Sequence, residues 1–389
     1  MRVAITGAQA AANAMRQINP DVVPVYPISP QTAIAETFAQ FVADGIVDSE
    51  LIRVESEHSA MSAAVGASAA GARVMTATAA NGLALMIEIV NIASGLRLPI
   101  VMNITNRSIG GPINIHCDHS DAMMARDLGW IQLFCEDNQE VYDYNFIAMR
   151  LSEHPDVLLP TMVNQDGFIT SHTVENVELL DDKAVKKFVG EYKPKNPLLD
   201  IRKPVTAGSF SLPYSYFETK RQEADALDRA KVVYPKICEE LGKITGRKYG
   251  YLERYMLDDA EVAIIVMNST AGTAKAVVDM MRQRGKKVGL LKPIMFRPFP
   301  YAEIREALGK IGRIAVLDRA ESLGANAPLF SEIQNAMFNS GHKPSIQSYI
   351  FGLGGREILE EDIEKVFSNL LSGRVGIEKR YIRCNGEEF

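Results

Sequence analysis

The feature that most constrains the fold of this chain is the alternation of short apolar runs with longer stretches of helical pattern. The first half contains six apolar, β-branched runs with the length of buried strands, at residues 2–5, 22–26, 51–54, 73–77, 99–104 and 157–163. Helical patterns long enough for crossover connections lie between them, at residues 8–17, 31–42, 57–70, 82–92 and 137–152. This order predicts an α/β fold with a doubly wound parallel sheet.

A second α/β series follows a break in the pattern. Residues 192–216 are rich in proline, lysine and small polar side chains, as long connectors are, and a charged helix is predicted at residues 217–241. The second series has strands at residues 261–267, 287–291, 313–317 and 346–351 and helices at residues 271–284, 301–308 and 326–336. We therefore expect a first domain over residues 1–240 including the connector, a second over residues 255–375, and a C-terminal tail over residues 376–389.

Charge and cysteine content exclude several classes of protein. The 42 basic and 48 acidic side chains give a net charge of −6, with no basic stripe that would bind a nucleic acid backbone. The longest uncharged stretches are too short to cross a bilayer, and residues 1–15 lack the apolar run of a secretory signal, so a cytoplasmic protein without a membrane span is expected. The four cysteines form no Cys-x-x-Cys pair, so any redox centre is expected in another chain.

Polar corners follow three of the predicted strands, where open α/β sheets bind ligands. Ser29 lies between two prolines before a predicted helix, and it can contact a ligand or simply cap that helix. Glu57 begins a helix, where the helix dipole alone favours a carboxylate, or where it can meet a cationic heterocycle. Arg107 precedes a flexible Gly-rich loop, and it can clamp a substrate carboxylate or form an ordinary surface ion pair.

Two further motifs are weaker signals. The His-Cys-Asp-His segment at residues 116–119 and Asp121 offer metal-ligand side chains. Adjacent loop positions rarely converge on one ion, however, so we expect no metal site and favour hydrogen bonds that hold the loop. The Gly-rich segment at residues 352–355 lacks the Gly-x-Gly-x-x-Gly spacing, and no other stretch supplies it, so a nicotinamide site is unsupported.

Taken together, the motifs resemble those of the alpha subunits of 2-oxoacid:ferredoxin oxidoreductases, most closely the pyruvate members. The resemblance covers nearly the whole chain. It rests on YPISP at residues 26–30, VESEHSA at 54–60, PINI at 112–115, DHSD at 118–121, RDLGWIQ at 126–132, FRPFP at 296–300 and GLGGR at 352–356. It implies a thiamine diphosphate-binding fold of the pyrimidine-binding type, followed by an α/β domain like the carboxyl-terminal domain of transketolase.

The same resemblance implies partners and site residues. A beta subunit would bind the diphosphate and magnesium, and gamma and ferredoxin-like delta subunits would complete a hetero-oligomer whose [4Fe-4S] clusters lie outside this chain. Five residues are placed against the cofactor: Ile28, Ser29, Glu57, Asn81 and Gly82. Glu57 takes the place of the glutamate that bonds the aminopyrimidine ring, while Arg107 and Ser29, a threonine in most members, meet the substrate carboxylate. Residues 78–82, TAANG, depart from a common TASQG pattern, and His116 with Cys117 replaces an aromatic-containing pair.

The function implied is oxidative decarboxylation of a 2-oxoacid, with pyruvate expected, in anaerobic metabolism. Coenzyme A is converted to acyl-CoA, CO2 is released, and electrons pass to ferredoxin. A branched-chain or aryl 2-oxoacid is the alternative substrate. Outside this class, a nucleotide-binding dehydrogenase and a non-catalytic scaffold subunit remain as alternatives.

Overall fold

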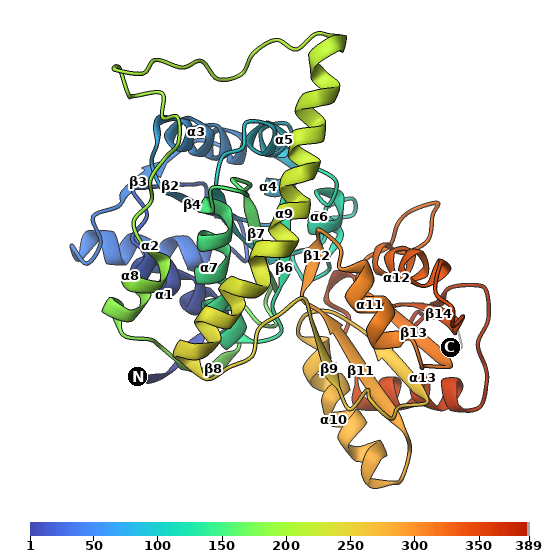
Figure 1. Cartoon of the computed structure of the whole chain (residues 1–389). Coiled ribbons are helices and arrows are strands. Elements are labelled where there is room, and N and C mark those ends of the chain that lie inside the picture. The colour runs from blue at the N-terminus through green and yellow to red at the C-terminus, as the bar shows by residue number, and fades with distance from the viewer. Residues whose placement is uncertain (387–389) are drawn as a thin grey trace.

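The structure is a computed structural model that describes residues 1–386, and it contains two α/β units, each built on its own sheet (Figure 1). The first sheet has the strand order β12-β6-β7-β5-β4-β2-β3, in which only β12 is antiparallel to its neighbour. Its strands are β2 (Val22–Val25), β3 (Glu50–Arg53), β4 (Val74–Thr78), β5 (Ile100–Asn106), β6 (Ile131–Phe134), β7 (Thr161–Asp166) and β12 (Met295–Arg297). This is the predicted doubly wound sheet, extended by one strand from the second half of the chain.

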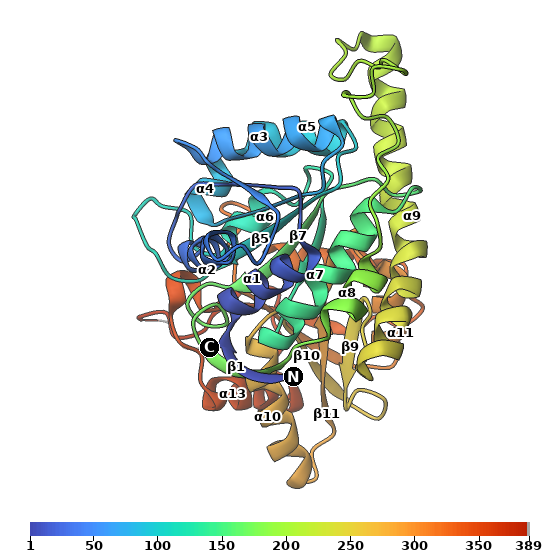
Figure 2. The ribbon, with the colours of Figure 1, turned by 90° about the vertical axis from the view of Figure 1, so that its left-hand side faces the viewer.

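Helices cover both faces of the first sheet, because successive strand residues point to opposite sides. Met75 and Val101 belong to the core that includes α1 (Gly7–Ile18), α2 (Thr32–Ala43) and α7 (Asn138–Glu153). Their neighbours Val74 and Met102 belong to the opposite core, with α3 (Glu57–Ala70), α4 (Ala80–Leu85) and α5 (Ile87–Gly95). Figure 2 shows α3 and α5 on one side of the strands and α1, α2 and α7 on the other.

The second unit repeats this layering around a six-stranded sheet of order β15-β14-β13-β10-β11-β9. Its strands are β9 (Leu252–Tyr255), β10 (Val262–Ile265), β11 (Val288–Pro293), β13 (Arg313–Asp318), β14 (Ser345–Ile350) and β15 (Arg380–Tyr381). Helices α10 (Thr270–Gln283) and α13 (Glu360–Leu371) cover one face, and α11 (Tyr301–Leu308) and α12 (Pro328–Phe338) cover the other. A short 3-10 helix, η1 (Leu353–Gly355), follows β14.

Two predicted strands differ from the structure. The strand predicted at residues 2–5 forms β1 (Arg2–Thr6), but β1 pairs with β8 (Val174–Glu178) in a separate antiparallel ribbon and not with the main sheet. The apolar pattern of a strand does not show which other strand it pairs with, because that pattern is the same in a small ribbon and in a large sheet. The strand predicted at residues 157–163 begins only at residue 161, since residues 155–157 form a turn.

Several further elements were missed, and one predicted helix is divided. The missed elements include the strands β8, β9, β12 and β15 and the helices α6 (Ser120–Met124), α8 (Asp182–Val189) and α13. Strand β6 was not predicted because it has only four residues and one of them, Gln132, is polar. The buried Gln132 amide donates from Nε2 to the carbonyl of Ala122 at 2.8 Å. The helix predicted at residues 82–92 is divided into α4 and α5 at Met86, whose backbone is not helical.

The connector joins the two units over a long path. After α8 (Asp182–Val189), residues 190–212 form no helix or strand, and Figure 1 shows them extending away from the body to the start of α9 (Pro213–Thr245). The long helix α9 then packs on α7 through buried residues such as Ala230 and Tyr234. Among residues 1–386, no helix is both long and apolar enough to cross a membrane.

Candidate functional site

Four adjacent strands of the first sheet end at one edge, and the residues singled out in the sequence follow those ends. Ser29 follows β2, Glu57 follows β3, Gly82 follows β4, and Arg107 comes directly after β5. Parallel strands place their carboxyl ends side by side, and open α/β sheets bind ligands there. The fold therefore brings four distant segments of the chain to one location.

Glu57 is a buried carboxylate without a partner. It is only 8% exposed, and no hydrogen bond or ion pair joins its side chain to any residue in the range 1–386. Ser56, not Glu57, caps α3 by accepting from the backbone N–H of Ser59 at 3.2 Å. The helix dipole favours Glu57 but does not explain its burial, because a buried charge is costly unless a group pairs with it. A ligand that donates a hydrogen bond would meet this requirement.

Gly82 makes room for Glu57. A Cβ built on Gly82 would lie 2.8 Å from Cγ and 2.9 Å from Oε1 of Glu57, and 2.6 Å from Oγ1 of Thr78. The Thr78 hydroxyl is also buried without a hydrogen-bond partner in the described part of the chain. Two unsatisfied polar groups thus flank one glycine, which is the environment a flat, hydrogen-bonding heterocycle requires.

Arg107 is fixed by main-chain oxygens. It is 6% exposed, and its Nη1 donates to the carbonyl of Ser29 at 2.8 Å while its Nε donates to the carbonyl of Asn114 at 3.1 Å. Its Nη2 has no partner within residues 1–386. Arg107 is therefore no surface ion-pair residue, and one arm of its guanidinium is left for an anionic group.

Ser29 and its neighbours form the turn opposite Arg107. Ser29 is exposed, and the cap position of α2 is Gln31, so the hypothesis that Ser29 merely caps this helix is wrong. The half-buried Ile28 donates its backbone N–H to Oε1 of Gln31 at 3.2 Å. Asn81 connects α4 to the loop after Arg107, because its Oδ1 accepts from the backbone N–H of Gly110 at 2.9 Å.

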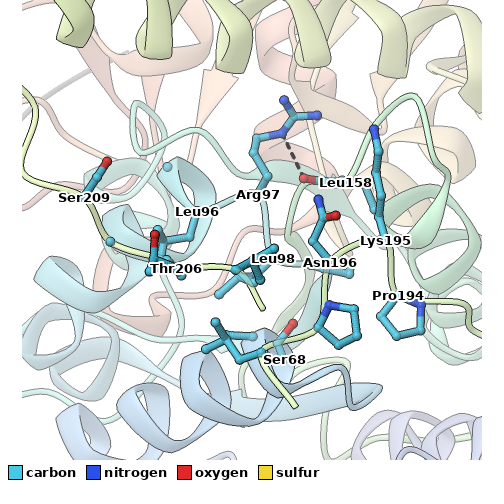
Figure 3. Close-up of a pocket in the computed structure, with 18 of the residues that line it drawn as sticks. Ser68, Leu96, Arg97, Leu98, Leu158, Pro194, Lys195, Asn196, Thr206 and Ser209 are labelled. Carbon is cyan, nitrogen blue, oxygen red and sulfur yellow. Dashed lines mark hydrogen bonds between the residues drawn. The ribbon is translucent and has the colours of Figure 1, made fainter. Parts of the chain in front are cut away.

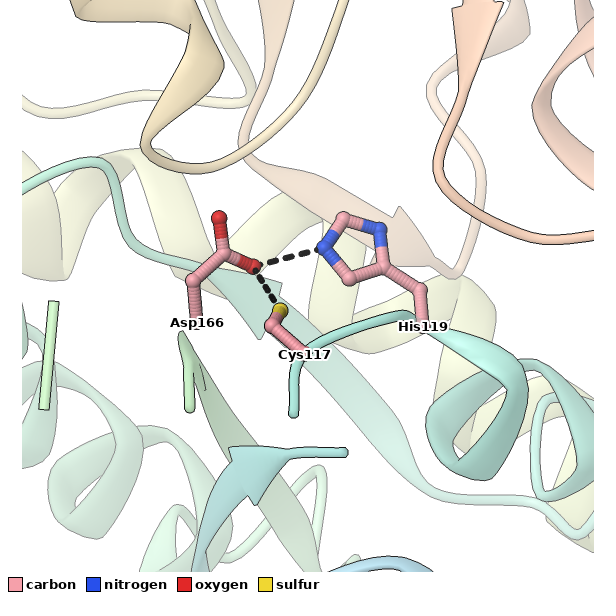
Figure 4. A group of neighbouring side chains, drawn as sticks. All are labelled: Cys117, His119 and Asp166. Atoms are coloured by element: carbon pink, nitrogen blue, oxygen red, sulfur yellow. Dashed lines mark hydrogen bonds and ion pairs between the residues drawn. The ribbon is translucent and has the colours of Figure 1, made fainter. Parts of the chain in front are cut away.

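A buried polar cluster lies near the loop that follows Arg107, and Figure 4 shows three of its members, Cys117, His119 and Asp166. The Asp166 carboxylate lies 2.8 Å from Nε2 of His119 and accepts from the Cys117 thiol at 3.3 Å, from Arg319 at 2.9 Å and from Asn268 at 2.9 Å. Burial alone would raise the pKa of Asp166, but Arg319 and His119 outweigh it and hold that pKa well below its usual range. Burial raises the pKa of the Cys117 thiol. Cys117, His119 and Asp166 present ligand atoms that lie within 4.8 Å of one another, and the Arg319 guanidinium adds a positive charge beside the Asp166 carboxylate. Hydrogen bonds to Asp166 connect these side chains in the structure.

The Gly-rich segment of the second unit is a contact surface for the same loop. The backbone N–H of Gly355 donates to the carbonyl of Cys117 at 2.7 Å, and the Asn114 amide donates to the carbonyl of Gly354 at 3.0 Å. Gly355 has a φ of 81°, and a Cβ there would lie 2.4 Å from Cβ of His116. The glycine is therefore required by close packing between the two units.

Sequence reasoning did not identify Thr78, Asp166 or Arg319 as parts of this region. Thr78 and Asp166 end β4 and β7, and Arg319 directly follows β13. Their positions at strand ends were the available signal. Which of them would meet, however, depends on packing between the two sheets.

A cavity of about 420 Å³ lies elsewhere, between the connector and the loop that leads into β5 (Figure 3). Arg97 at its wall donates from Nε to the carbonyl of Leu158 at 3.1 Å. Leu98 and Pro99 precede β5, so the cavity lies at the amino edge of the sheet, opposite the site.

Comparisons with known proteins identify the family. Residues 13–239 match the family described as pyruvate flavodoxin/ferredoxin oxidoreductase, thiamine diphosphate-binding, and residues 260–363 match pyruvate:ferredoxin oxidoreductase core domain II. The chain is 57% identical to pyruvate synthase subunit PorA of Thermotoga maritima, over 98% of this chain and 97% of that protein. It is 47% identical to the PorA subunit of Methanocaldococcus jannaschii, over 94% of both. It is 42% identical to ketoisovalerate oxidoreductase subunit VorA of Pyrococcus abyssi, over 94% of this chain and 92% of that protein.

Two solved structures share the fold. The 2-oxoglutarate:ferredoxin oxidoreductase from Magnetococcus marinus superposes with a TM-score of 0.72 at 18% identity, over 95% of this chain and 65% of that one. A split-gene transketolase, an inactive beta4 tetramer, superposes with a TM-score of 0.58 at 13% identity, over 95% of this chain and 99% of that one. At these identities the likeness concerns the fold alone.

The fold and the family match together define a thiamine diphosphate-binding α/β subunit. More particularly, the chain belongs to the pyruvate flavodoxin/ferredoxin oxidoreductase family, as an alpha-type subunit of a 2-oxoacid:ferredoxin oxidoreductase. The alternative of a nucleotide-binding dehydrogenase is wrong.

Proposed function

We propose that this chain supplies the pyrimidine half of a thiamine diphosphate site that oxidises pyruvate. The reaction consumes coenzyme A, releases acyl-CoA and CO2, and passes electrons to ferredoxin. The observation that carries the proposal is Glu57, a buried carboxylate that lacks a partner among the described residues and lies against Gly82. The relatives named as pyruvate synthase subunits support pyruvate as the substrate.

The residues at this edge fit the aminopyrimidine ring. Those that would hold it are Ile28, Ser29, Glu57, Asn81 and Gly82. When bound, thiamine diphosphate supplies the nucleophilic carbon that attacks the 2-oxo group. Glu57 holds a proton at the ring nitrogen, because a carboxylate bonded to that atom stabilises the protonated ring. Burial strengthens this contact, since little solvent screens it.

Arg107 and Ser29 would bind the substrate carboxylate. The hydrogen bonds from Arg107 to the carbonyls of Ser29 and Asn114 hold the guanidinium in place before substrate arrives. Its free Nη2 and the exposed Ser29 hydroxyl are the donors available to an anion. Fixing both donors in advance lowers the entropy cost of orienting the substrate.

Partner chains would complete the enzyme. We assign the diphosphate and magnesium to a beta subunit, and the remaining electron-transfer steps to gamma and ferredoxin-like delta subunits, with the [4Fe-4S] clusters outside this chain. The two main sheets support the division into domains at residues 1–240 and 255–375, with two differences. Strands β9 and β15 extend the second sheet beyond these bounds, and β12, inside the second range, pairs with β6 of the first sheet. A cytoplasmic location is supported by four free cysteines, since reducing compartments keep thiols free.

A branched-chain 2-oxoacid is the second candidate substrate. The observation in its favour is the ketoisovalerate oxidoreductase relative at 42% identity. Ser29 also lacks the methyl group of the threonine found in most members, which leaves more space at the substrate.

The test uses the complex purified with its partner subunits. Coenzyme A-dependent oxidation is measured with pyruvate, 2-oxoisovalerate and an aryl 2-oxoacid, using a low-potential electron acceptor. Glu57→Gln should lower the rate by about 10²- to 10⁴-fold, the usual cost of a positioned acid or base. Glu55→Gln is the matched control, because Glu55 is exposed and bonds only Ser59. A complex that does not oxidise pyruvate, or equal rates for both variants, would contradict the proposal.

A further inference from the structure

Asp121 is a buried carboxylate at the start of α6 (Ser120–Met124), and no cation pairs with it in the part of the chain described. Its Oδ2 accepts from the backbone N–H groups of Ala80 at 2.9 Å and Arg107 at 3.0 Å. Its Oδ1 accepts from the Asn106 amide at 2.9 Å and from the backbone N–H of Ala122 at 2.7 Å. Four donors therefore replace the water that this carboxylate loses on burial.

The two donors to Oδ2 belong to the two halves of the site. Ala80 is the first residue of α4 and directly precedes Asn81 and Gly82, on the cofactor side. Arg107 carries the guanidinium on the substrate side. All four neighbours of the Asp121 carboxylate are N–H donors, so both of its oxygens act as acceptors. Burial raises the pKa of Asp121 to about 6, although its hydrogen bonds oppose this shift. One oxygen atom thus connects the end of β4 to the end of β5.

Ala80 has a backbone conformation that needs such a contact. Its φ is 44°, in the left-handed region that side chains other than glycine rarely adopt. Residues persist in this region only where surrounding structure holds them. The hydrogen bond from its N–H to Asp121 is a contact of that kind.

We propose that Asp121 is a positioning residue, which fixes the backbone of Ala80 and Arg107 through one oxygen and so sets the spacing between the Glu57–Gly82 contact and the Arg107 guanidinium. This inference rests on the proposed function, because it assigns the two sides to one reaction. No hydrogen bond or ion pair joins Asp121 to Glu57 or to the side chain of Arg107. Asp121 acts through the main chain, so its loss should change both the backbone positions of Ala80 and Arg107 and the binding of substrate.

The direct readout is hydrogen–deuterium exchange in the assembled complex. Asp121→Asn keeps the size but replaces an accepting oxygen with a donating amide. The amides of Ala80 and Arg107 should exchange at least about ten-fold faster, which corresponds to about 1.4 kcal/mol. Asp318→Asn is the matched control, since Asp318 is also buried and accepts two backbone N–H groups, from Leu329 at 2.8 Å and Phe330 at 3.0 Å, but lies in the second unit. It should leave exchange at residues 80 and 107 within about twofold.

Kinetics and a rescue variant test the consequence. Asp121→Asn should raise KM for pyruvate about ten-fold or more, whereas Asp318→Asn should not. Glycine takes a φ of 44° without penalty. Adding Ala80→Gly to Asp121→Asn should therefore lower the raised KM part of the way back to the wild-type value. If Asp121→Asn does not assemble, the double variant is compared with Ala80→Gly alone, and exchange at Arg107 should still be faster in the double variant.

The outcomes separate this inference from the proposed function. Unchanged exchange at residues 80 and 107, the same KM in Asp121→Asn as in the wild type, or the same KM change in Asp318→Asn would overturn the role of Asp121. A wild-type complex that oxidises no 2-oxoacid would overturn the proposed function instead. In that case the exchange comparison alone decides whether Asp121 holds the two strand ends together.

Discussion

Glu57 occupies the space that a side chain at residue 82 would need. A Cβ on Gly82 would lie 2.8 Å from Cγ of Glu57 and 2.9 Å from its Oε1, although Glu57 begins α3 and Gly82 lies in the first turn of α4. The absence of a side chain at Gly82 is therefore what allows α4 to approach a buried carboxylate. This relationship gives the first prediction.

Gly82→Ala should displace the Glu57 carboxylate. Because the added methyl also meets Thr78, overpacking should destabilise the chain by about 1–3 kcal/mol and weaken thiamine diphosphate binding by the complex. Thermal unfolding and a cofactor titration measure the two effects. Gly66→Ala on α3 is the control, since a Cβ there meets nothing within 4 Å and should stabilise the helix by about 0.5–1 kcal/mol. Equal effects of the two substitutions would contradict the role of Gly82.

Arg107→Lys should weaken substrate binding more than folding. An ammonium group cannot keep both main-chain hydrogen bonds and still present a second arm to a carboxylate. We expect kcat/KM for pyruvate to fall at least ten-fold, or about 1.4 kcal/mol. Ser29→Ala removes one hydroxyl, a loss of about 0.5–1.5 kcal/mol, and the two effects should not add, because both residues hold the same carboxylate. If Arg107→Lys stays within about twofold of wild type, roughly 0.4 kcal/mol, the clamp assignment is wrong.

The chain alone should bind thiamine diphosphate weakly. The proposed site offers a pocket for the pyrimidine ring, while the magnesium ion and the diphosphate groups are assigned to a partner subunit. Affinity should therefore appear when the subunits assemble. Calorimetry on the isolated chain and on the complex measures the difference, and tight, magnesium-dependent binding to the isolated chain would refute the shared site.

Asp318 should make the chain less stable as the pH rises. Burial raises the pKa of this carboxyl from 3.8 to about 7, although backbone hydrogen bonds from Leu329 and Phe330 oppose the shift. The folded chain then binds the proton more tightly than the unfolded chain, so this contribution is complete below about pH 4 and is lost as the pH rises through 7. Asp318→Asn removes this dependence of stability on pH. The free energy of unfolding of the variant should therefore rise relative to that of the wild type by up to about 1.4 kcal/mol per pH unit between pH 5 and 7. Denaturant unfolding at several pH values tests this, and parallel stability curves would refute it.

Local patterns in the sequence determined the α/β class and the edge where the site lies. Apolar runs of four to seven residues mark β2, β4 and β5 because buried strands of a parallel sheet need apolar side chains on both faces. Ser29, Glu57 and Arg107 each follow the end of a strand by four residues or fewer, so their common edge follows from the direction of the chain. Their individual roles came from the family resemblance, and the assignment of Glu57 is supported by the lack of a partner for its carboxylate among residues 1–386.

Only the tertiary structure decided which segments meet. The separate pairing of β1 with β8, the addition of β12 to the first sheet and the contact of Asp166 with Arg319 all join residues far apart along the chain. Likewise, the burial of Arg107 against two carbonyls replaces the surface ion pair that its sequence context equally allowed. The physical reason is that the periodicity of side chains is a local property, whereas strand order, burial and hydrogen-bond satisfaction depend on the packing of the whole chain.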